Sequence, residues 1–268
     1  MPPTLSPLET AQRYWRYYAR RRHTRATVFF TMSVMMQALK LAIQLIEKSD
    51  AQQRPIRTAR FLIAVPIAIL QIIGYQLSSQ IATQRAVVSD LSTFNFHTVV
   101  DDHIPLIPEF AWLYFLYLPS LIIPCLVKTS FRVFFQYVTA FLLSFTGAFL
   151  SFYLFPGKIE HSPLNCTDIS CDALLFLRSI DAGNNLMPSL HAAQCMIAFL
   201  ALFISRLKFR TIPLWLIWSP LYIGIVASTV FTKQHYFIDI PAGLIWGGAC
   251  WYFTRIITSK MTSYDKDA

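Results

Sequence analysis

The sequence predicts an all-α, polytopic membrane protein that has a six-helix transmembrane core bundle and an N-terminal amphipathic or seventh helix. Three observations support this fold class: the composition, the lengths of the apolar runs and the distribution of positive charge. Of the 268 residues, 55% are hydrophobic and only 14% are charged, whereas soluble domains carry about 25% charged residues. The composition therefore excludes an ordinary soluble domain.

Six apolar runs reach about twenty residues, the length needed to cross roughly 30 Å of hydrocarbon. They lie at residues 60–79, 109–128, 131–155, 188–205, 212–231 and 236–257. A further run at 27–46 is interrupted by Gln37, Lys40 and Gln44. It predicts either a seventh span or, as we prefer, an amphipathic helix that lies in the membrane interface.

Positive charge collects on one side of these spans. If the six spans alternate and residues 1–59 lie with the C-terminus, only four of the 23 Lys and Arg residues fall on the other side: Arg85, Lys158, Arg178 and Lys233. The positive-inside rule makes the basic side cytoplasmic. The net charge of +9 thus reflects topology, and we expect no nucleic-acid partner.

This topology divides the chain into three parts. We expect a cytoplasmic basic and aromatic region at 1–59, a six-span catalytic core at 60–257 and a cytoplasmic tail at 258–268. The loops at 80–108, 157–186 and 232–235 then face away from the cytoplasm.

Two short stretches carry candidate chemistry. The first runs from Asn184 to His191 and opens an apolar run. It predicts a helix start, with the asparagines as caps and Pro188 at the first helical position. Backbone N–H groups at such a start favour anions. Ser189 and His191 add a hydroxyl and a titratable imidazole.

The second stretch contains His235 and Asp239, four residues apart. On a helix this spacing puts both side chains on one face. A carboxylate there fixes the imidazole tautomer and makes the ring a better nucleophile. Because ionisable groups are costly within a span, Asp239 is interpreted as functional.

The outer loops hold further candidates. Lys158 suits either a phosphate ligand or an interface lysine whose stem lies along apolar surface, and Arg178 and Lys233 are further possible ligands. Cys166 and Cys171 predict a disulfide if the compartment is oxidising. The His and Asp residues of segment 80–108 favour a lid or an interfacial helix over a metal site, and we expect no metal or other cofactor.

The two histidine motifs resemble those of the type-2 phosphatidic acid phosphatase and haloperoxidase superfamily, which carries Lys-x6-Arg-Pro, Pro-Ser-Gly-His and Ser-Arg-x5-His-x3-Asp. Pro188 to His191 is similar to the second motif, with Leu190 in place of Gly. Ser228 to Asp239 is similar to the third, with Thr229 in place of Arg. The first motif departs further, since Asn165 follows Lys158 where Arg is expected.

The resemblance implies a two-step phosphoryl transfer at the outer membrane face. His235 attacks phosphorus and is oriented by Asp239, while His191 protonates the leaving oxygen. Ser189, Lys158, Lys233 and Arg178 are the implied phosphate ligands. The substrate is a phospholipid or a sphingolipid.

Three functions follow from this comparison. Hydrolysis of a lipid phosphomonoester is the leading one. The Ser-Leu-His and His-Tyr-x-x-Asp forms are also similar to inositol phosphorylceramide and sphingomyelin synthases, which transfer a phosphoalcohol head group to a lipid alcohol. A non-enzymatic membrane protein that has kept the fold is the third.

Overall fold

The computed structural model describes residues 56–88, 94–127, 129–159, 161, 164, 168–181 and 183–264. The helix predicted at 27–46 lies outside the described residues, as do Cys166 and Asn165. The chain divides into two compact units, Met1–Ile63 and Ala64–Ala268. All contacts discussed below lie within the second unit.

The described residues are mostly helical. The first part of the described chain forms two long helices and several short ones, all before His191: α2 (Ile56–Val88), α3 (Val99–His103), α4 (Phe110–Phe115), α5 (Tyr117–Ser120), α6 (Ile123–Leu126), α7 (Phe131–Leu154) and α8 (Ile169–Ile180). They are followed by α9 (Leu190–Ser205), the strands β1 (Lys208–Phe209) and β2 (Ile212–Pro213), α10 (Leu214–Phe231) and α11 (Asp239–Tyr264). The strands pair antiparallel, with Lys208 opposite Pro213.

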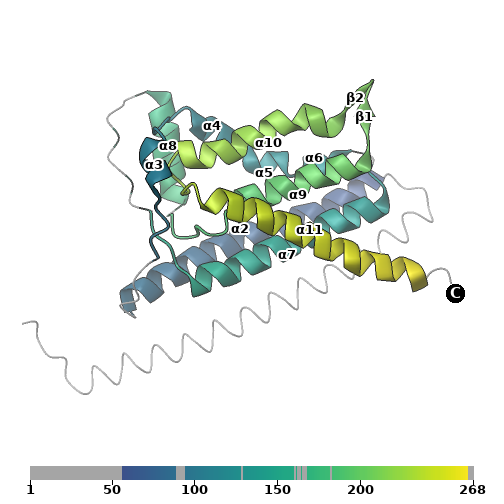
Figure 1. The fold of residues 1–268 in the computed structure, drawn as a ribbon, viewed down its shortest axis with the longest axis horizontal. Helices are drawn as coiled ribbons and strands as arrows, with labels where there is room; N and C mark the ends of the chain where they lie inside the picture. The colour runs from purple at the N-terminus through teal and green to yellow at the C-terminus, as the bar shows by residue number, and fades with distance from the viewer. Residues whose placement is uncertain are drawn as a thin grey trace, which may run out of the picture. The chain divides into compact units, whose positions relative to one another are not determined.

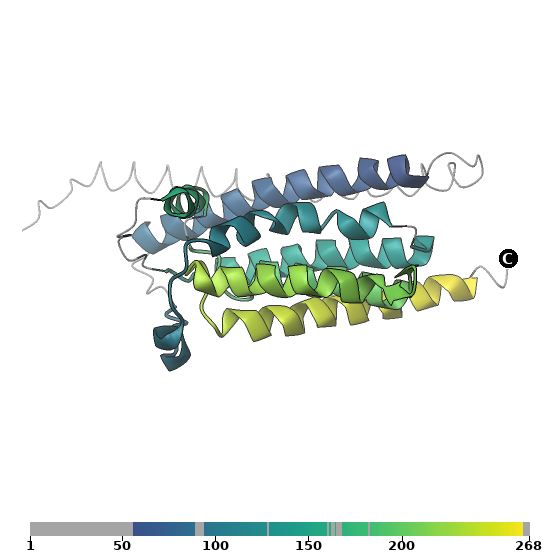
Figure 2. The same ribbon diagram turned by 90° about the horizontal axis from the view of Figure 1, so that it is seen from above.

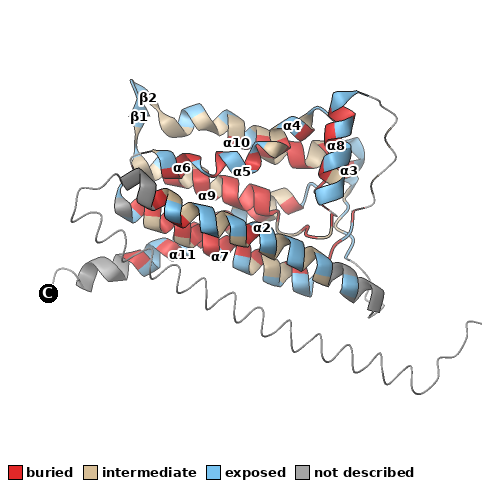
Figure 3. Ribbon diagram, turned by 180° about the vertical axis from the view of Figure 1, so that it is seen from behind, coloured by how far each residue is buried: buried red, intermediate tan, exposed pale blue. Residues whose placement is uncertain are grey.

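Helix α9 is the centre of the second unit. It packs against α7, α10 and α11, and the three helices run beside it in Figures 1 and 2. Most of its residues are buried, and Ala192, Ala193 and Ala198 have no exposed surface. Figure 3 shows buried residues, in red, between the helices and exposed residues, in pale blue, on outer surfaces such as that of α2. A helix that is apolar all round is expected to occupy such a core position.

Small residues let α11 approach α9 closely. A Cβ atom at Gly247 would lie 2.2 Å from the carbonyl oxygen of Ala193, and one at Gly243 would lie 2.4 Å from that of Ser189. Small residues at helix interfaces are typical of membrane proteins, because they permit close backbone packing. The contact fixes the start of α11 against the start of α9.

Polar side chains also join the helices inside the bundle. The amide groups of Gln71 in α2 and Gln194 in α9 exchange hydrogen bonds of 3.1 and 3.0 Å. Tyr117 donates its hydroxyl to the same Gln194 oxygen. Because an unpaired amide is costly in an apolar environment, this reciprocal pairing determines how α2 and α9 face each other.

The predicted span at 109–128 is not one continuous helix. The structure divides it into α4, α5 and α6. Pro119 and Pro124 are the physical reason, because proline has no backbone N–H and its ring clashes with the carbonyl four residues earlier. The other five predicted runs each correspond to one helix, and α11 continues beyond residue 257 to Tyr264.

Within the described residues, three helices are long and apolar enough to cross a membrane. These segments are Arg60–Ile81 of α2, Arg132–Leu154 of α7 and Leu214–Phe231. Helix α9 is apolar but shorter. Large apolar side chains such as Ile223 and Ile245, 69% and 73% exposed, point outward, as lipid-facing residues do. The six-span count stays a prediction.

The close contact between α9 and α11 generates a stability prediction. Gly247→Ala is expected to destabilise the fold by about 1–3 kcal/mol, because the new methyl group meets the backbone of Ala193 and not a movable side chain. Gly248→Ala is the matched control: nothing lies within 4 Å of its Cβ position, so alanine should leave stability unchanged or raise it by up to about 1 kcal/mol. Thermal unfolding in detergent measures both. Equal melting temperatures for the two variants would contradict the close packing.

Candidate active site

His235 and Asp239 form a buried pair. The Nδ1 atom of His235 lies 3.1 Å from Oδ2 of Asp239, and the two side chains are 2% and 0% exposed. The expected contact is present, although the two residues do not share a helix. α11 begins at Asp239, and His235 precedes it in a turn.

The same carboxylate oxygen shapes that turn. Oδ2 of Asp239 also accepts a hydrogen bond of 3.0 Å from the backbone N–H of Tyr236. A carboxylate near a helix start that accepts from the backbone N–H three residues earlier makes the reciprocal bond of a capping box. An ionised carboxylate only accepts hydrogen bonds, so this contact favours the His235 tautomer with the proton on Nδ1 and the lone pair on Nε2.

His191 lies next to this pair. Its ring centroid is 5.5 Å from that of His235, at an interplanar angle of 71°. The rings of Tyr114 and Tyr117 contact its other sides, with centroid separations of 4.5 and 4.1 Å. The tyrosines thus limit the orientations of the His191 imidazole.

Ser189 begins α9, in contrast to the expected cap at the asparagines and first helical position at Pro188. Its hydroxyl accepts a hydrogen bond from the backbone N–H of Ala192, which makes it the N-cap. The helix therefore starts at Leu190 because serine satisfies an otherwise unpaired donor of the first turn. The serine O–H stays able to donate.

A backbone hydrogen bond joins the two motifs directly. The N–H of Ser189 donates to the carbonyl oxygen of Asp239 over 3.1 Å. The starts of α9 and α11 are consequently adjacent, and His191 and Asp239 each lie within two residues of this bond.

Two further groups hold the turn that carries His235. The carbonyl oxygen of Thr229, fully buried, accepts from the N–H groups of both Gln234 and His235 at 2.9 and 3.0 Å. Lys233 adopts a φ of 56°, the left-handed conformation that commonly follows a helix C-terminus. The end of α10 therefore fixes the backbone of the nucleophile candidate.

Asp101 of α3 secures the far side of that turn. Its Oδ1 accepts from the N–H of Phe237 at 2.7 Å, and its backbone carbonyl accepts from the Lys233 ammonium at 2.8 Å. Asp101 is buried. Residues 94–103, part of the segment 80–108 expected to form a lid or an interfacial helix, thus contact the site through specific polar bonds.

Asp181 is a second buried polar residue near the site, and Tyr114 connects it to His191. It accepts from the hydroxyls of Tyr75 and Tyr114, at 3.0 and 2.8 Å. Because Tyr114 contacts the His191 ring, Asp181 fixes one wall of the His191 pocket. Sequence reasoning missed Asp101, Asp181 and the two tyrosines around His191, because long-range pairing has no sequence spacing that identifies it.

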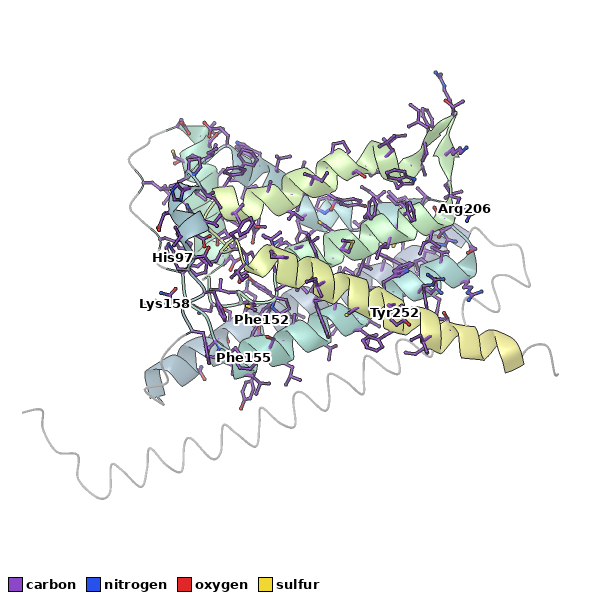
Figure 4. All side chains as sticks on the ribbon, viewed as in Figure 1. His97, Phe152, Phe155, Lys158, Arg206 and Tyr252 are labelled. Atoms are coloured by element: carbon purple, nitrogen blue, oxygen red, sulfur yellow. The ribbon has the colours of Figure 1, made fainter. Side chains whose placement is uncertain are left out.

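The predicted phosphate-binding cations lie in three different environments. Lys158 is exposed, and its carbonyl oxygen accepts from the Tyr236 hydroxyl at 3.4 Å; Figure 4 places it with His97 at one end of the helices. Lys233 donates to the backbone of Asp101. Arg178, half-buried in α8, lies close enough to His161 for its positive charge to lower the pKa of that imidazole. Of the three, Lys158 and Lys233 lie in segments that contact the turn bearing His235.

The surroundings of His161 favour the neutral form of its imidazole. Burial lowers the pKa of its imidazole, and the positive charge of Arg178 lowers it further, while Asp181 acts in the opposite direction. Burial likewise lowers the pKa of the Arg178 guanidinium. His161 and Arg178 of α8 are therefore partly desolvated neighbours.

A polar group with no assigned role lies beside His235. Both side-chain polar atoms of Gln234, 1% exposed, have no hydrogen-bond partner among the described residues. The Nδ1 atom of His191 and Oδ1 of Asp239 likewise have no hydrogen-bond partner among the described residues. Buried polar atoms are normally paired, so these four atoms of three residues are candidates to bind a polar substrate.

The cysteines and the metal question have simple outcomes. Cys171 is disulfide-bonded, while its expected partner Cys166 lies outside the described residues. Cys125, Cys195 and Cys250 are buried thiols that form no disulfide. Among the described residues, no three His, Cys, Asp or Glu side chains gather as metal ligands do.

The arrangement suits nucleophilic catalysis on an anionic substrate. It joins a buried imidazole with a free Nε2 lone pair, a carboxylate that orients this ring, a second imidazole nearby and a helix start with a serine cap. These are the elements of a nucleophile, its orienting group and an acid or base.

The comparisons with known proteins agree with the character of this site. The family model of the PAP2 superfamily matches residues 141–263, a segment that contains Ser189, His191, His235 and Asp239. Comparisons with curated proteins and with solved structures found no match. The chain is therefore similar to the PAP2 superfamily over this segment, and the three helices long and apolar enough to cross a membrane indicate a membrane protein.

The bond from Asp101 to the His235 turn generates a local prediction. Asp101→Ala is expected to raise hydrogen exchange at the Phe237 amide by about tenfold or more, because an unsatisfied donor costs about 1–3 kcal/mol. Asp102→Ala is the control, since Asp102 is exposed and pairs only with the exposed His97, a contact worth about 0–1 kcal/mol. Exchange mass spectrometry of peptides spanning 234–240 measures both. Equal protection in the two variants would show that Asp101 does not hold the turn.

Proposed function

We propose that the chain is a membrane lipid phosphatase that hydrolyses a lipid phosphomonoester through a phosphohistidine on His235. The observation that carries the proposal is the buried contact between His235 Nδ1 and Asp239 Oδ2, with the His191 ring 5.5 Å away, inside the segment matched by the PAP2 family model. The active site would face the non-cytoplasmic side.

In the first step, Nε2 of His235 attacks phosphorus and the ester P–O bond breaks. Asp239 accepts a hydrogen bond from Nδ1–H of His235 and stabilises the positive charge that develops on the ring. His191 donates a proton to the leaving alkoxide, which departs as a lipid alcohol. This step requires His191 in its protonated form.

In the second step, water attacks the phosphohistidine. His191, now neutral, takes a proton from the water, and the P–N bond breaks to give inorganic phosphate and free His235. Proton balance is restored, because the proton given in the first step returns in the second. Both steps use the same two imidazoles.

Charge stabilisation during these steps falls to several groups. The first turn of α9 presents backbone N–H groups, and the Ser189 hydroxyl can donate to a phosphoryl oxygen. Lys158, Lys233 and Arg178 are the proposed cations. Gln234, whose amide is buried and unpaired among the described residues, is a further candidate donor to the substrate.

One observation favours a transferase as the second candidate. Thr229 stands where the motif of the resembled family has arginine, and the neutral threonine side chain supplies no positive charge. A phosphodiester carries less negative charge than a phosphomonoester and requires fewer cations. The alternative reaction would move a phosphoalcohol from the phosphohistidine to a lipid alcohol in place of water.

The roles of the two histidines can be tested by substitution. His235→Ala and His191→Ala should each lower turnover of a lipid phosphomonoester by at least about 10²-fold, in line with loss of a nucleophile or a positioned acid. His103→Ala is the control, because His103 is exposed on α3 and its Nδ1 bonds only to its own helix. Phosphate release by the purified protein in detergent measures the rates. More than about a tenth of the wild-type rate in either site variant would refute the assignment.

The two reactions predict different products. A phosphatase should release inorganic phosphate from phosphatidic acid without an acceptor. A transferase should act on a phosphodiester lipid only when diacylglycerol or ceramide is present, and should give no free phosphate. Parallel assays of both substrates, with His235→Ala as the blank, decide between them. Head-group transfer alone would reject hydrolysis, and activity toward neither lipid class would favour a non-enzymatic role.

A further inference from the structure

A second candidate site lies at the end of the bundle opposite to the histidines. Figure 4 shows Arg206 there, far from His97 and Lys158. α9 runs between the two ends, with His191 in its first turn and Arg206 as its C-cap. At a rise of 1.5 Å per residue, these fifteen steps span about 22 Å. The two ends would therefore face opposite membrane surfaces.

A pocket of about 680 Å³ opens at this end. Its lining comes from α7, the end of α9, the β1–β2 hairpin, α10 and α11. The volume falls within the range of about 300–1,000 Å³ that small-molecule sites occupy. Because five segments converge on it, the pocket is a product of the tertiary fold and not of one loop.

Four cations line the pocket: Arg132, Arg206, Lys208 and Arg255. No lining residue is acidic. Within the described residues, the ion pairs found for Asp or Glu are His97–Asp102 and His235–Asp239, and neither involves these four. Four convergent cations in one concavity repel one another, and an anion would relieve this repulsion.

The acidic residues within the described ranges lie elsewhere. They occur on α3 and the start of α4, on α8 and its ends, and at Asp239. α3 and α8 lie at the histidine end in Figure 1, and the β1–β2 hairpin lies at the other. The pocket thus occupies a region where the described charges are all positive.

An apolar wall stands beside the cations. Phe203 and Trp215 line the pocket and pack edge to face with a centroid separation of 5.6 Å. Phe203 is 49% exposed. Aromatic side chains next to Lys and Arg are typical of the level of lipid head groups, where a ligand has both a charged group and a chain.

We propose that this pocket binds the phosphate head group of an anionic lipid, in the membrane leaflet opposite to the one that the histidine site faces. Arg132, Arg206, Lys208 and Arg255 contact the phosphate oxygens, and Phe203 and Trp215 contact the start of the acyl chains. The site is separate from the histidines, so it does not depend on the reaction proposed for them. Bidentate bonds from arginine to phosphate would supply the specificity.

The test counts lipids bound to the full chain carrying His235→Ala, which prevents turnover. Native mass spectrometry resolves one bound dioctanoyl phosphatidic acid from two, so a lipid at the histidine site does not obscure the second. Arg206→Gln/Arg255→Gln in this background should lose one bound lipid, with at least about tenfold weaker affinity, because two charge-assisted contacts are removed. Dioctanoyl phosphatidylcholine should not occupy this site.

Arg210→Gln is the matched control. Arg210 is exposed in the same hairpin but is not part of the pocket lining, and its guanidinium lies 5.8 Å from the Phe209 ring centroid. The control should bind as the parent does. Thermal unfolding of each variant checks folding, and Arg255→Gln alone provides a second, milder variant that should weaken binding in the same direction.

Three results would overturn the proposal. Unchanged lipid binding by the double variant would remove the pocket as the site. An equal loss in Arg210→Gln would reduce the effect to general charge attraction. Displacement of the lipid by inorganic phosphate at equal concentration would show that the pocket takes a soluble anion and not a lipid.

Discussion

The backbone contact between α9 and α11 is the constraint on which the rest of the site depends. Gly243 and Gly247 let α11 approach the carbonyl groups of Ser189 and Ala193. The N–H of Ser189 then reaches the carbonyl oxygen of Asp239. Without this approach, the helix start that carries His191 would be separated from the turn that carries His235. The lack of side chains at two positions thus brings two remote motifs together.

Buried polar groups give this apolar bundle its specific geometry. Hydrocarbon offers no alternative partners, so each buried amide or hydroxyl favours the arrangement that satisfies it. The Gln71–Gln194 exchange orients α2 against α9, and Asp181 holds the tyrosine beside His191. Around the two histidines this satisfaction is incomplete, with Gln234 and one oxygen of Asp239 unpaired among the described residues.

The described acidic side chains and the cations of the pocket lie at opposite ends of the bundle. The described carboxylates lie at the histidine end, where Asp101 and Asp181 accept hydrogen bonds that hold the site in place. At the other end, arginines and a lysine line a pocket with aromatic neighbours. The positive-inside rule accounts for the number of cations there. It does not account for their convergence from separate helices on one concavity.

The helical class, the five apolar runs that form single helices, and the association of Ser189, His191, His235 and Asp239 could be predicted from the amino-acid sequence. The helices follow from the lengths of the apolar runs, and the pairing of His235 with Asp239 follows from their four-residue offset. The sequence alone did not predict the division of 109–128, where prolines override an apolar run, or the start of α11 at Asp239. Only the tertiary structure identified Asp101, Asp181, Tyr114 and the basic pocket. Their roles arise from contacts between segments far apart in the chain, and no local spacing encodes those contacts.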